Sequence, residues 1–505
     1  MSWEAEVEEL RRREALAARM GGAEKVARQH ARGKLDARGR IAALADAGSF
    51  REIGATAGRA TYDDAGALID LQASNFIFGR ADIGGRPAVV SADDFTVRGG
   101  AADAAIHRKF VQCEAMAHEL GLPLIRMIDG TGGGGSVKTL EQSGATYVPA
   151  VPGWSDVVTN LDRVPVVAMA LGPTAGLGAA RVCASHYSLM VRGLSQLFAA
   201  GPAVVAAIGE QSEREELGGS AVHTRNGVVD EEVESEAEAF ARTRAFLSYL
   251  PSCVGRLPPF VTAHDPVDRR EQSLIDLVPR DPKLVYPMRR LLSAVVDHDT
   301  LFEMGRRWGR GVITAFARFD GKPAAVLASD PSFLGGSWDA KSSEKVERFI
   351  RLADQFRLPI VHLVDNPGFM IGRVAEAAGT IRYGVQAMNA VYRATVPLAC
   401  VVVRRAYGIA GSAMSNADRF QYRFAWPSGD WGSLPIEGGI EVAYRAELEA
   451  AEDPSARLAE IRDRLNRVRS PFRTAERFGI EDIIDPRDTR PLLCEFVDLA
   501  WQRLS

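Results

Sequence analysis

An internal repeat is the feature that most constrains the fold of this 505-residue chain. Residues 85–88 (Gly-Arg-Pro-Ala) recur as 321–324 (Gly-Lys-Pro-Ala), and Asp129 recurs as Asp365, so each pair lies 236 positions apart (321 − 85 and 365 − 129). Ordered matches at a constant offset cannot arise from composition, and they indicate two copies of one structural unit. We therefore predict two homologous domains: 1–262 and 263–505.

Each copy contains the same succession of helix, strand and glycine-bearing loop. Apolar residues at three- and four-residue spacing predict an amphipathic helix, and short apolar runs that end in Asp or small residues predict buried strands. Strands that alternate with helices, with glycine loops at strand ends, predict a layered α/β fold whose ligand loops lie at the strand ends. The helix and two strands are expected at 106–120, 124–128 and 164–171 in the first copy, and at 346–356, 360–364 and 396–403 in the second.

Composition excludes several classes of function. A net charge of −4 argues against a general nucleic-acid binder, and no apolar run approaches the roughly 18 to 20 residues that span a bilayer. The acidic start of the chain is unlike a secretory or mitochondrial leader, so we expect a cytoplasmic protein. The five cysteines are far apart and form no CxxC pair, so we expect neither a disulfide framework nor a metal site in this chain.

Three glycine-rich segments are candidate ligand loops. Residues 129–136 resemble a phosphate-binding loop in spacing, but Ser136 stands where that motif requires Lys. The alternative for this segment is a mobile loop without a ligand. Its place after a buried strand, however, favours a loop whose backbone approaches a ligand closely. Residues 172–180 and 406–413 each follow an apolar strand and open a helix, so free N–H groups form a candidate oxyanion hole. Tight strand–helix packing without chemistry is the alternative for either loop alone.

Side-chain catalysts are scarce in the sequence. The chain has no GxSxG nucleophile motif, no HExxH and no His/Cys spacing typical of a metal site. His223 and His362 are isolated, which is typical of structural histidines. A reaction served mainly by backbone donors, with a cofactor that supplies its own base, fits this inventory.

Ordered motifs over nearly the whole chain resemble the carboxyltransferase (β) subunits of biotin-dependent acyl-CoA carboxylases, the propionyl-CoA, acetyl-CoA and methylcrotonyl-CoA type. So many matches in one order make the resemblance specific. They are 33–41 with 46–50, 94–100, 216–219 followed by His223, 364–369, 405–408 and 482–491.

The resemblance implies two tandem ClpP/crotonase-like β-β-α superhelical domains and a ring-like homohexamer, with the active site between the first domain of one subunit and the second domain of another. Acyl-CoA is expected on the first domain, with its thioester oxygen at the N–H groups of Gly176 and Leu177. Carboxybiotin is expected on the second, with its ureido oxygen at those of Ile409 and Ala410. Further substrate-binding residues implied are Gly130, Gly132, Gly133, Ala175, Gly408, Gly411 and Ser412.

The resemblance also implies the reaction. Carboxybiotin loses CO2, the biotin anion removes the α-proton of the acyl-CoA, and the enolate attacks the CO2. Because the chain has no Met-Lys-Met biotinylation site and no ATP-grasp loop, biotin is expected on a partner, the biotin carboxylase/biotin carboxyl carrier subunit. No metal is expected in this subunit.

The chain departs from the family pattern near the substrates. The family usually has Gly-Gly where this chain has Gly176-Leu177, Gly-Ala where it has Ile409-Ala410, and, in propionyl-type enzymes, Asp where Ser412 stands. Residues 134–138, 428–432 and 437–439 also differ from the family pattern, so the sequence does not determine which acyl-CoA is the substrate. A decarboxylase or transcarboxylase subunit, a biotin-independent crotonase-like hydratase or isomerase, and a catalytically silent scaffold remain alternatives.

Overall fold

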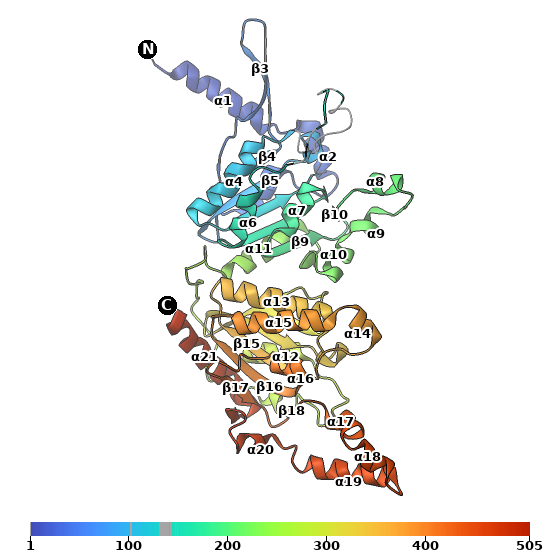
Figure 1. The fold of residues 1–505 in the computed structure, drawn as a ribbon. Coiled ribbons are helices and arrows are strands. Elements are labelled where there is room, and N and C mark those ends of the chain that lie inside the picture. Colours follow the sequence, from blue (N-terminus) through green and yellow to red (C-terminus); the bar gives the residue numbers. More distant parts are fainter. Residues whose placement is uncertain are drawn as a thin grey trace. The chain divides into compact units, whose positions relative to one another are not determined.

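The computed structural model describes residues 2–101, 104–130, 141, 144–146, 148 and 150–504. The chain forms two compact units, Met1–Arg256 and Leu257–Ser505, each with its own sheet and helices (Figure 1). The homologous domains 1–262 and 263–505 stay a prediction, because the repeat defines homology whereas these units are defined by compactness.

In the described part of unit 1, a seven-stranded mixed sheet has the order β1-β4-β5-β6-β7-β9-β11. β4 and β5 form an antiparallel hairpin, and from β5 onward the neighbours are parallel. Two small sheets pair β2 with β3 and β8 with β10. The strands are β1 Arg51–Glu52, β2 Gly58–Tyr62, β3 Leu68–Ala73, β4 Phe76–Ile83, β5 Arg86–Asp93, β6 Leu124–Ile128, β7 Val166–Ala170, β8 Pro173–Ala175, β9 Tyr187–Val191, β10 Gln196–Phe198 and β11 Glu231–Val233.

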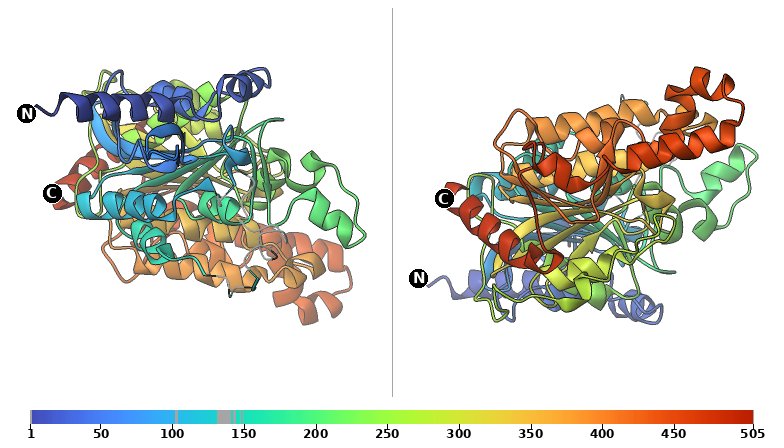
Figure 2. Two further views of the ribbon diagram at one scale, coloured as in Figure 1. Left: turned by 90° about the horizontal axis from the view of Figure 1, so that it is seen from above. Right: turned by 90° about the horizontal axis from the view of Figure 1, so that it is seen from below.

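Helix α4 covers the unit 1 sheet because its apolar face packs on the hairpin strands. Phe110 of α4 meets Phe76 of β4 with ring centroids 6.2 Å apart, and Gly121 ends the helix with a left-handed φ of 60°. The segment of α8 and α9 extends away from this sheet (Figures 1 and 2). The helices are α1 Glu4–Ala18, α2 Ala23–His30, α3 Ala37–Leu44, η1 Arg98–Gly100, α4 His107–Leu120, α6 Trp154–Leu161, α7 Leu177–Cys183, α8 Pro202–Ala207, α9 Arg214–Gly218, α10 Ser220–Asn226 and α11 Glu236–Ser248.

Unit 2 repeats the strand order of unit 1. Its sheet runs β12-β13-β14-β15-β16-β17-β19, with β18 paired to the end of β16, so β15 and β16 occupy the places of β6 and β7. The strands are β12 Phe302–Met304, β13 Val312–Phe319, β14 Lys322–Ser329, β15 Ile360–Asn366, β16 Leu398–Tyr407, β17 Tyr422–Ala425, β18 Asp430–Gly432 and β19 Asp482–Ile483.

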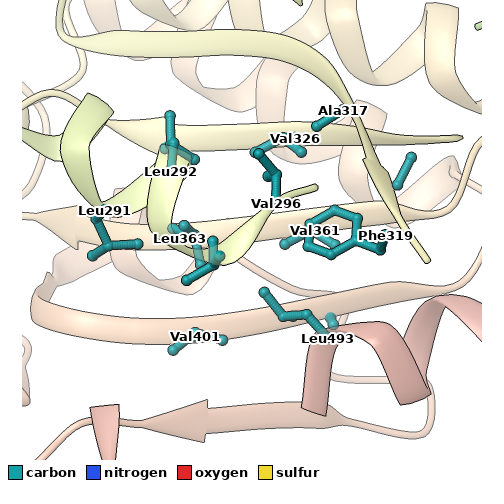
Figure 3. Close-up of a cluster of buried hydrophobic side chains, with 14 of the residues drawn as sticks. Leu291, Leu292, Val296, Ala317, Phe319, Val326, Val361, Leu363, Val401 and Leu493 are labelled. Carbon is teal, nitrogen blue, oxygen red and sulfur yellow. The ribbon is translucent and has the colours of Figure 1, made fainter. Parts of the chain in front are cut away.

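Both faces of the unit 2 sheet are covered. Side chains alternate along a strand, so Phe319 of β13 joins a core with Leu292 of α12 and Leu493 of α21 (Figure 3). On the other face, Phe316 of β13 meets Phe349 of α13 with ring centroids 5.6 Å apart. The helices are η3 Gln272–Leu274, α12 Met288–Val295, η4 Leu334–Gly336, α13 Ala340–Gln355, α14 Arg373–Ala377, α15 Thr380–Arg393, α16 Gly408–Ser412, α17 Ile436–Ala443, α18 Arg445–Glu449, α19 Pro454–Asn466, α20 Pro471–Ala475, η5 Pro486–Asp488 and α21 Thr489–Leu504.

Candidate active site

Unit 1 presents a turn of peptide N–H groups where α7 follows β8. Gly176 has φ 58° and ψ −122°, and its carbonyl accepts the first helical hydrogen bond, from Ala180 at 3.0 Å. The N–H groups of Leu177 and Gly178 therefore lie in the first turn, without a partner inside the helix. The N–H of Gly176 donates to the carbonyl of Phe198 at 3.2 Å, so this donor already has a partner in β10.

The loop after β6 lies against this turn. A Cβ placed on Gly178 would be 3.7 Å from the carbonyl oxygen of Gly130, and one on Gly130 would be 2.5 Å from that of Gly100. Glycine at 130 therefore allows the loop after β6 to approach the backbone of Gly100 closely, and Gly178 lies in contact with the same loop. Ala175 ends β8 beside them and is half-buried. Gly132 and Gly133, the other residues predicted in this loop, lie outside the described residues.

A buried ionic cluster lies at the start of the same loop. Asp129 accepts from Arg40 Nη1 at 2.7 Å, Lys34 Nζ at 2.5 Å and Gln29 Nε2 at 3.2 Å. Burial works against the charge of Arg40, yet Asp129 and Glu236 raise its pKa on balance, whereas burial lowers the pKa of Lys34. The cluster fixes the end of β6 with charges that were not predicted from the sequence.

Four basic side chains, from α2 and the chain around it and from η1, line a pocket of 230 Å³ beside the Gly100 turn. They are Lys25, Arg28, Arg32 and Arg98. Such a cluster suits the phosphate groups of an anionic ligand. The motif analysis missed this pocket, although the three- and four-residue spacing of the first three cations was a signal for one basic helical face.

Unit 2 presents a corresponding turn where α16 follows β16. Gly408 has a left-handed φ of 62°, and a Cβ there would be 3.5 Å from the carbonyl of Ser433. Ala413 donates to the carbonyl of Ile409 at 3.0 Å, so the N–H groups of Ile409 and Ala410 lie in the first turn of the helix. Ala410 is buried, whereas Ile409 is 52% exposed.

Gly411 and Ser412 complete the unit 2 turn. A Cβ on Gly411 would be 2.9 Å from the carbonyl carbon of Ala406, so a larger residue would push the turn away from β16. Ser412 is exposed, and its Oγ donates to the carbonyl of Gly408 at 3.2 Å. Its side chain is therefore available to a ligand at the surface of the turn.

The two isolated histidines contact backbone carbonyls. His223 Nε2 lies 2.8 Å from the carbonyl of Leu197, and His362 Nδ1 lies 3.1 Å from that of Met414. His362 is buried in β15 beside Trp338, and burial lowers its pKa to about 4. Among the residues that the structure describes, no group of three or more His, Cys, Asp or Glu could hold a metal ion. Within the same residues, no helix is long and apolar enough to cross a membrane.

Comparison with known proteins decides the family. The sequence profile of the carboxyl transferase domain matches residues 28–505. The chain belongs to the carboxyl transferase family. This carboxyltransferase is 35% identical to the propionyl-CoA carboxylase beta chain of Cereibacter sphaeroides. The alignment of 508 residues covers 99% of this chain and 97% of that protein. It is 32% identical to the methylmalonyl-CoA decarboxylase subunit alpha of Veillonella parvula, over 93% of this chain and 91% of that protein.

A solved structure supports the same assignment. The transcarboxylase 12S structure, described as a hexamer with methylmalonyl-coenzyme A bound, matches the carboxyltransferase with a TM-score of 0.89 and 31% identity, over 99% of this chain and 96% of that one. The predicted family and the tandem crotonase-like α/β fold are thus confirmed. The protein is an enzyme subunit of the biotin-dependent acyl-CoA carboxylase type. The individual site residues stay predictions.

Proposed function

We propose that this carboxyltransferase moves a carboxyl group between carboxybiotin, held on a partner protein, and the α-carbon of an acyl-CoA. One observation supports the proposal most directly. The two sheets have the same strand order, and the strands β7 and β16, which occupy corresponding places in them, each lead into a turn of peptide N–H groups. Two oxyanions develop in such a transfer, one on the thioester and one on the ureido group. Donors aimed at a developing charge are worth roughly 3 to 4 kcal/mol each.

Unit 1 suits the acyl-CoA. The basic pocket of Lys25, Arg28, Arg32 and Arg98 would hold the phosphates, and η1 connects it to the backbone that touches Gly130. The thioester oxygen would then accept from Leu177, with Gly176 as a shared donor because its N–H already contacts Phe198. Positioning of the thioester against fixed dipoles lowers the barrier to enolate formation.

Unit 2 suits the biotin ring. Carboxybiotin supplies the carboxyl group and, once it has given that up, the base for the α-proton. The residues fit a ureido oxygen because the N–H groups of Ile409 and Ala410 lie in the first turn of one helix. The partner would be a biotin carboxylase/biotin carboxyl carrier subunit, and the working assembly a homohexamer like that described for transcarboxylase 12S.

The physiological direction has two candidates. The relatives include carboxylase beta chains, but also a methylmalonyl-CoA decarboxylase subunit and the methylmalonyl-CoA carboxyltransferase 12S subunit of Propionibacterium freudenreichii, so decarboxylation or transcarboxylation is the second candidate. A hydratase or isomerase would need carboxylates at the acyl α- and β-carbons. Residues 172–180 and 406–413 carry none, which disfavours that class.

The test uses the purified full chain with methylmalonyl-CoA or malonyl-CoA and free biotin. We expect loss of the carboxylated CoA ester that depends on biotin, and a hexamer by light scattering. Crotonyl-CoA without biotin is the control for hydratase activity. Absence of biotin-dependent turnover with either ester, from a correctly assembled protein, would refute the proposal. If crotonyl-CoA were also left unchanged, the result would support the alternative of a catalytically silent scaffold protein.

A further inference from the structure

A buried carboxylate at the end of β15 joins the two strand ends that support the unit 2 turn. Asp365 is fully buried, and its Oδ2 accepts from Arg404 Nε at 3.0 Å and Nη2 at 2.9 Å. Its Oδ1 accepts from Arg405, through Nε at 2.6 Å and the peptide N–H at 3.2 Å. One side chain therefore satisfies two consecutive arginines and one backbone donor.

This arrangement depends on a bulge in β16. The pairing of β15 with β16 passes from Val364↔Val402 to Asn366↔Ala406, so Asp365 alone faces residues 403–405. Extra residues in one strand bend it and re-aim the side chains beyond the bulge. Here the bulge turns Arg404 and Arg405 toward the same carboxylate, and it immediately precedes the backbone that enters the turn at Gly408.

Arg405 extends the support to a second loop. Its Nη2 donates to the carbonyl of Gly335 at 2.7 Å, and a Cβ on Gly336 would be 2.3 Å from the carbonyl of Asp365 itself. The η4 turn, the end of β15 and the end of β16 are thus held around one charge. Loss of the Asp365 charge would leave the half-buried guanidinium of Arg405 without its carboxylate partner, so this side chain would have to rearrange.

Asp129, which corresponds to Asp365 in the repeat, joins two strand ends in unit 1 in the same way, but with different cations. Asp129 accepts from Arg40, whose Nη2 donates to the carbonyl of Leu171 at 2.9 Å, at the end of β7. A Cβ on Gly172 would be 2.1 Å from Asp129 Oδ1, so the carboxylate touches the backbone that leads to Gly176. Both units thus have an Asp at the repeat position. Its cationic partners are Lys34 and Arg40 in unit 1, and Arg404 and Arg405 in unit 2.

We propose that Asp365 and Asp129 are positioning residues of this carboxyltransferase, each holding one oxyanion turn: Asp365 the biotin side and Asp129 the acyl-CoA side. The proposal rests on the proposed function. Neither carboxylate touches a substrate; each acts through the strand end that carries the turn. Preorganised donors lose their effect when they shift, and a displacement of about 1 Å can cost about 100-fold in rate.

The two substitutions should therefore have different signatures. For Asp365→Asn we expect kcat in the free-biotin assay to fall about 100-fold and KM for biotin to rise, while KM for methylmalonyl-CoA stays at the wild-type value. For Asp129→Asn we expect the same fall in kcat, with KM for methylmalonyl-CoA raised and KM for biotin unchanged. A general loss of stability would not divide the two Michaelis constants in this way.

Asp297→Asn is the matched control, because Asp297 forms another buried pair in unit 2, with Arg490 Nη2 at 2.8 Å, on the core between α12 and α21. We expect a fall in the unfolding temperature comparable to that of Asp365→Asn, with both Michaelis constants and kcat within about 3-fold of wild type. Arg405→Lys keeps the charge but loses the forked contact, and it should reproduce the biotin-side signature if Asp365→Asn fails to assemble.

Wild-type kinetics in an assembled Asp365→Asn or Arg405→Lys hexamer would overturn the biotin-side role of Asp365. An equal change of both Michaelis constants in every variant would show that the two carboxylates stabilise the fold and do not position the turns. Inactivity of the wild type would instead refute the proposed function, so the two failures are distinguishable.

Discussion

The peptide N–H of Gly176 donates to the carbonyl of Phe198 across 3.2 Å, which joins the start of α7 to β10. The donor expected to face the thioester thus already has a partner, and Gly176 adopts a φ of 58° that proline cannot reach. A proline at this position would remove the hydrogen bond to Phe198 and strain the backbone. The neighbouring N–H of Leu177 is the cleaner place to test the turn.

We predict that Leu177→Pro lowers kcat by about 100- to 1,000-fold while the unfolding temperature changes little. Leu177 is the first residue of α7, the helical position where proline is tolerated, so the substitution deletes one peptide donor at small structural cost. Leu177→Ala is the control, because it removes the side chain and keeps the N–H. Equal kinetics of the two variants in the free-biotin assay would move the oxyanion donor elsewhere.

We predict that the double substitution Arg28→Ala and Arg32→Ala raises KM for methylmalonyl-CoA about 10-fold or more and reduces its dependence on salt. The reason is the loss of two of the four cations that line the 230 Å³ pocket. A methylmalonyl-pantetheine thioester, which lacks the nucleotide phosphates, should be used equally by variant and wild type. Arg11→Ala on α1, outside the pocket, is the control. A KM that rises equally for both thioesters would show that the pocket does not hold the nucleotide end.

We predict that Ser412→Asp changes acyl preference more than the rate with the best substrate. Ser412 is exposed on the unit 2 turn, at the position where the resemblance of the sequence to the family implies an Asp in propionyl-type enzymes. The expected shift toward short acyl groups is about 10- to 200-fold, or about 1 to 3 kcal/mol. The measurement is kcat/KM for acetyl-, propionyl- and a longer acyl-CoA with one biotin carrier. Unchanged ratios would place Ser412 outside the acyl pocket.

We predict that His362 makes the protein less stable as the pH falls. Burial lowers its folded-state pKa to about 4, below the 6.5 of an exposed histidine. The unfolded chain therefore binds more protons between these two values, so the free energy of unfolding decreases as the pH falls through this window, by up to about 3 kcal/mol. His362→Gln should flatten this decrease in denaturant titrations at pH 7 and pH 5. The same pH dependence in both proteins would assign it to other groups.

The repeat, the glycine segments and the family were determined by the sequence alone, because each is a local or periodic signal. Asp129 and Asp365 mark the ends of corresponding strands whatever the path of the intervening chain, and the small residues around Gly176 and Gly408 already indicate where backbone must stay exposed. The helix expected at 106–120 is observed as α4, His107–Leu120, for the same reason. Periodicity of apolar residues specifies which face is buried.

Only the tertiary structure decided what those features contact. Arg40 reaches both Asp129 and Glu236, which are 89 and 196 residues away in the sequence, and spacing does not encode such a meeting. The bulge that brings Arg404 and Arg405 to one carboxylate is a register shift between strands, which depends on how β15 and β16 pair rather than on either strand alone. The occupied N–H of Gly176 likewise follows from pairing with β10. Hydrogen bonds and ion pairs between distant segments are set by packing, so they became visible only when the chain was folded.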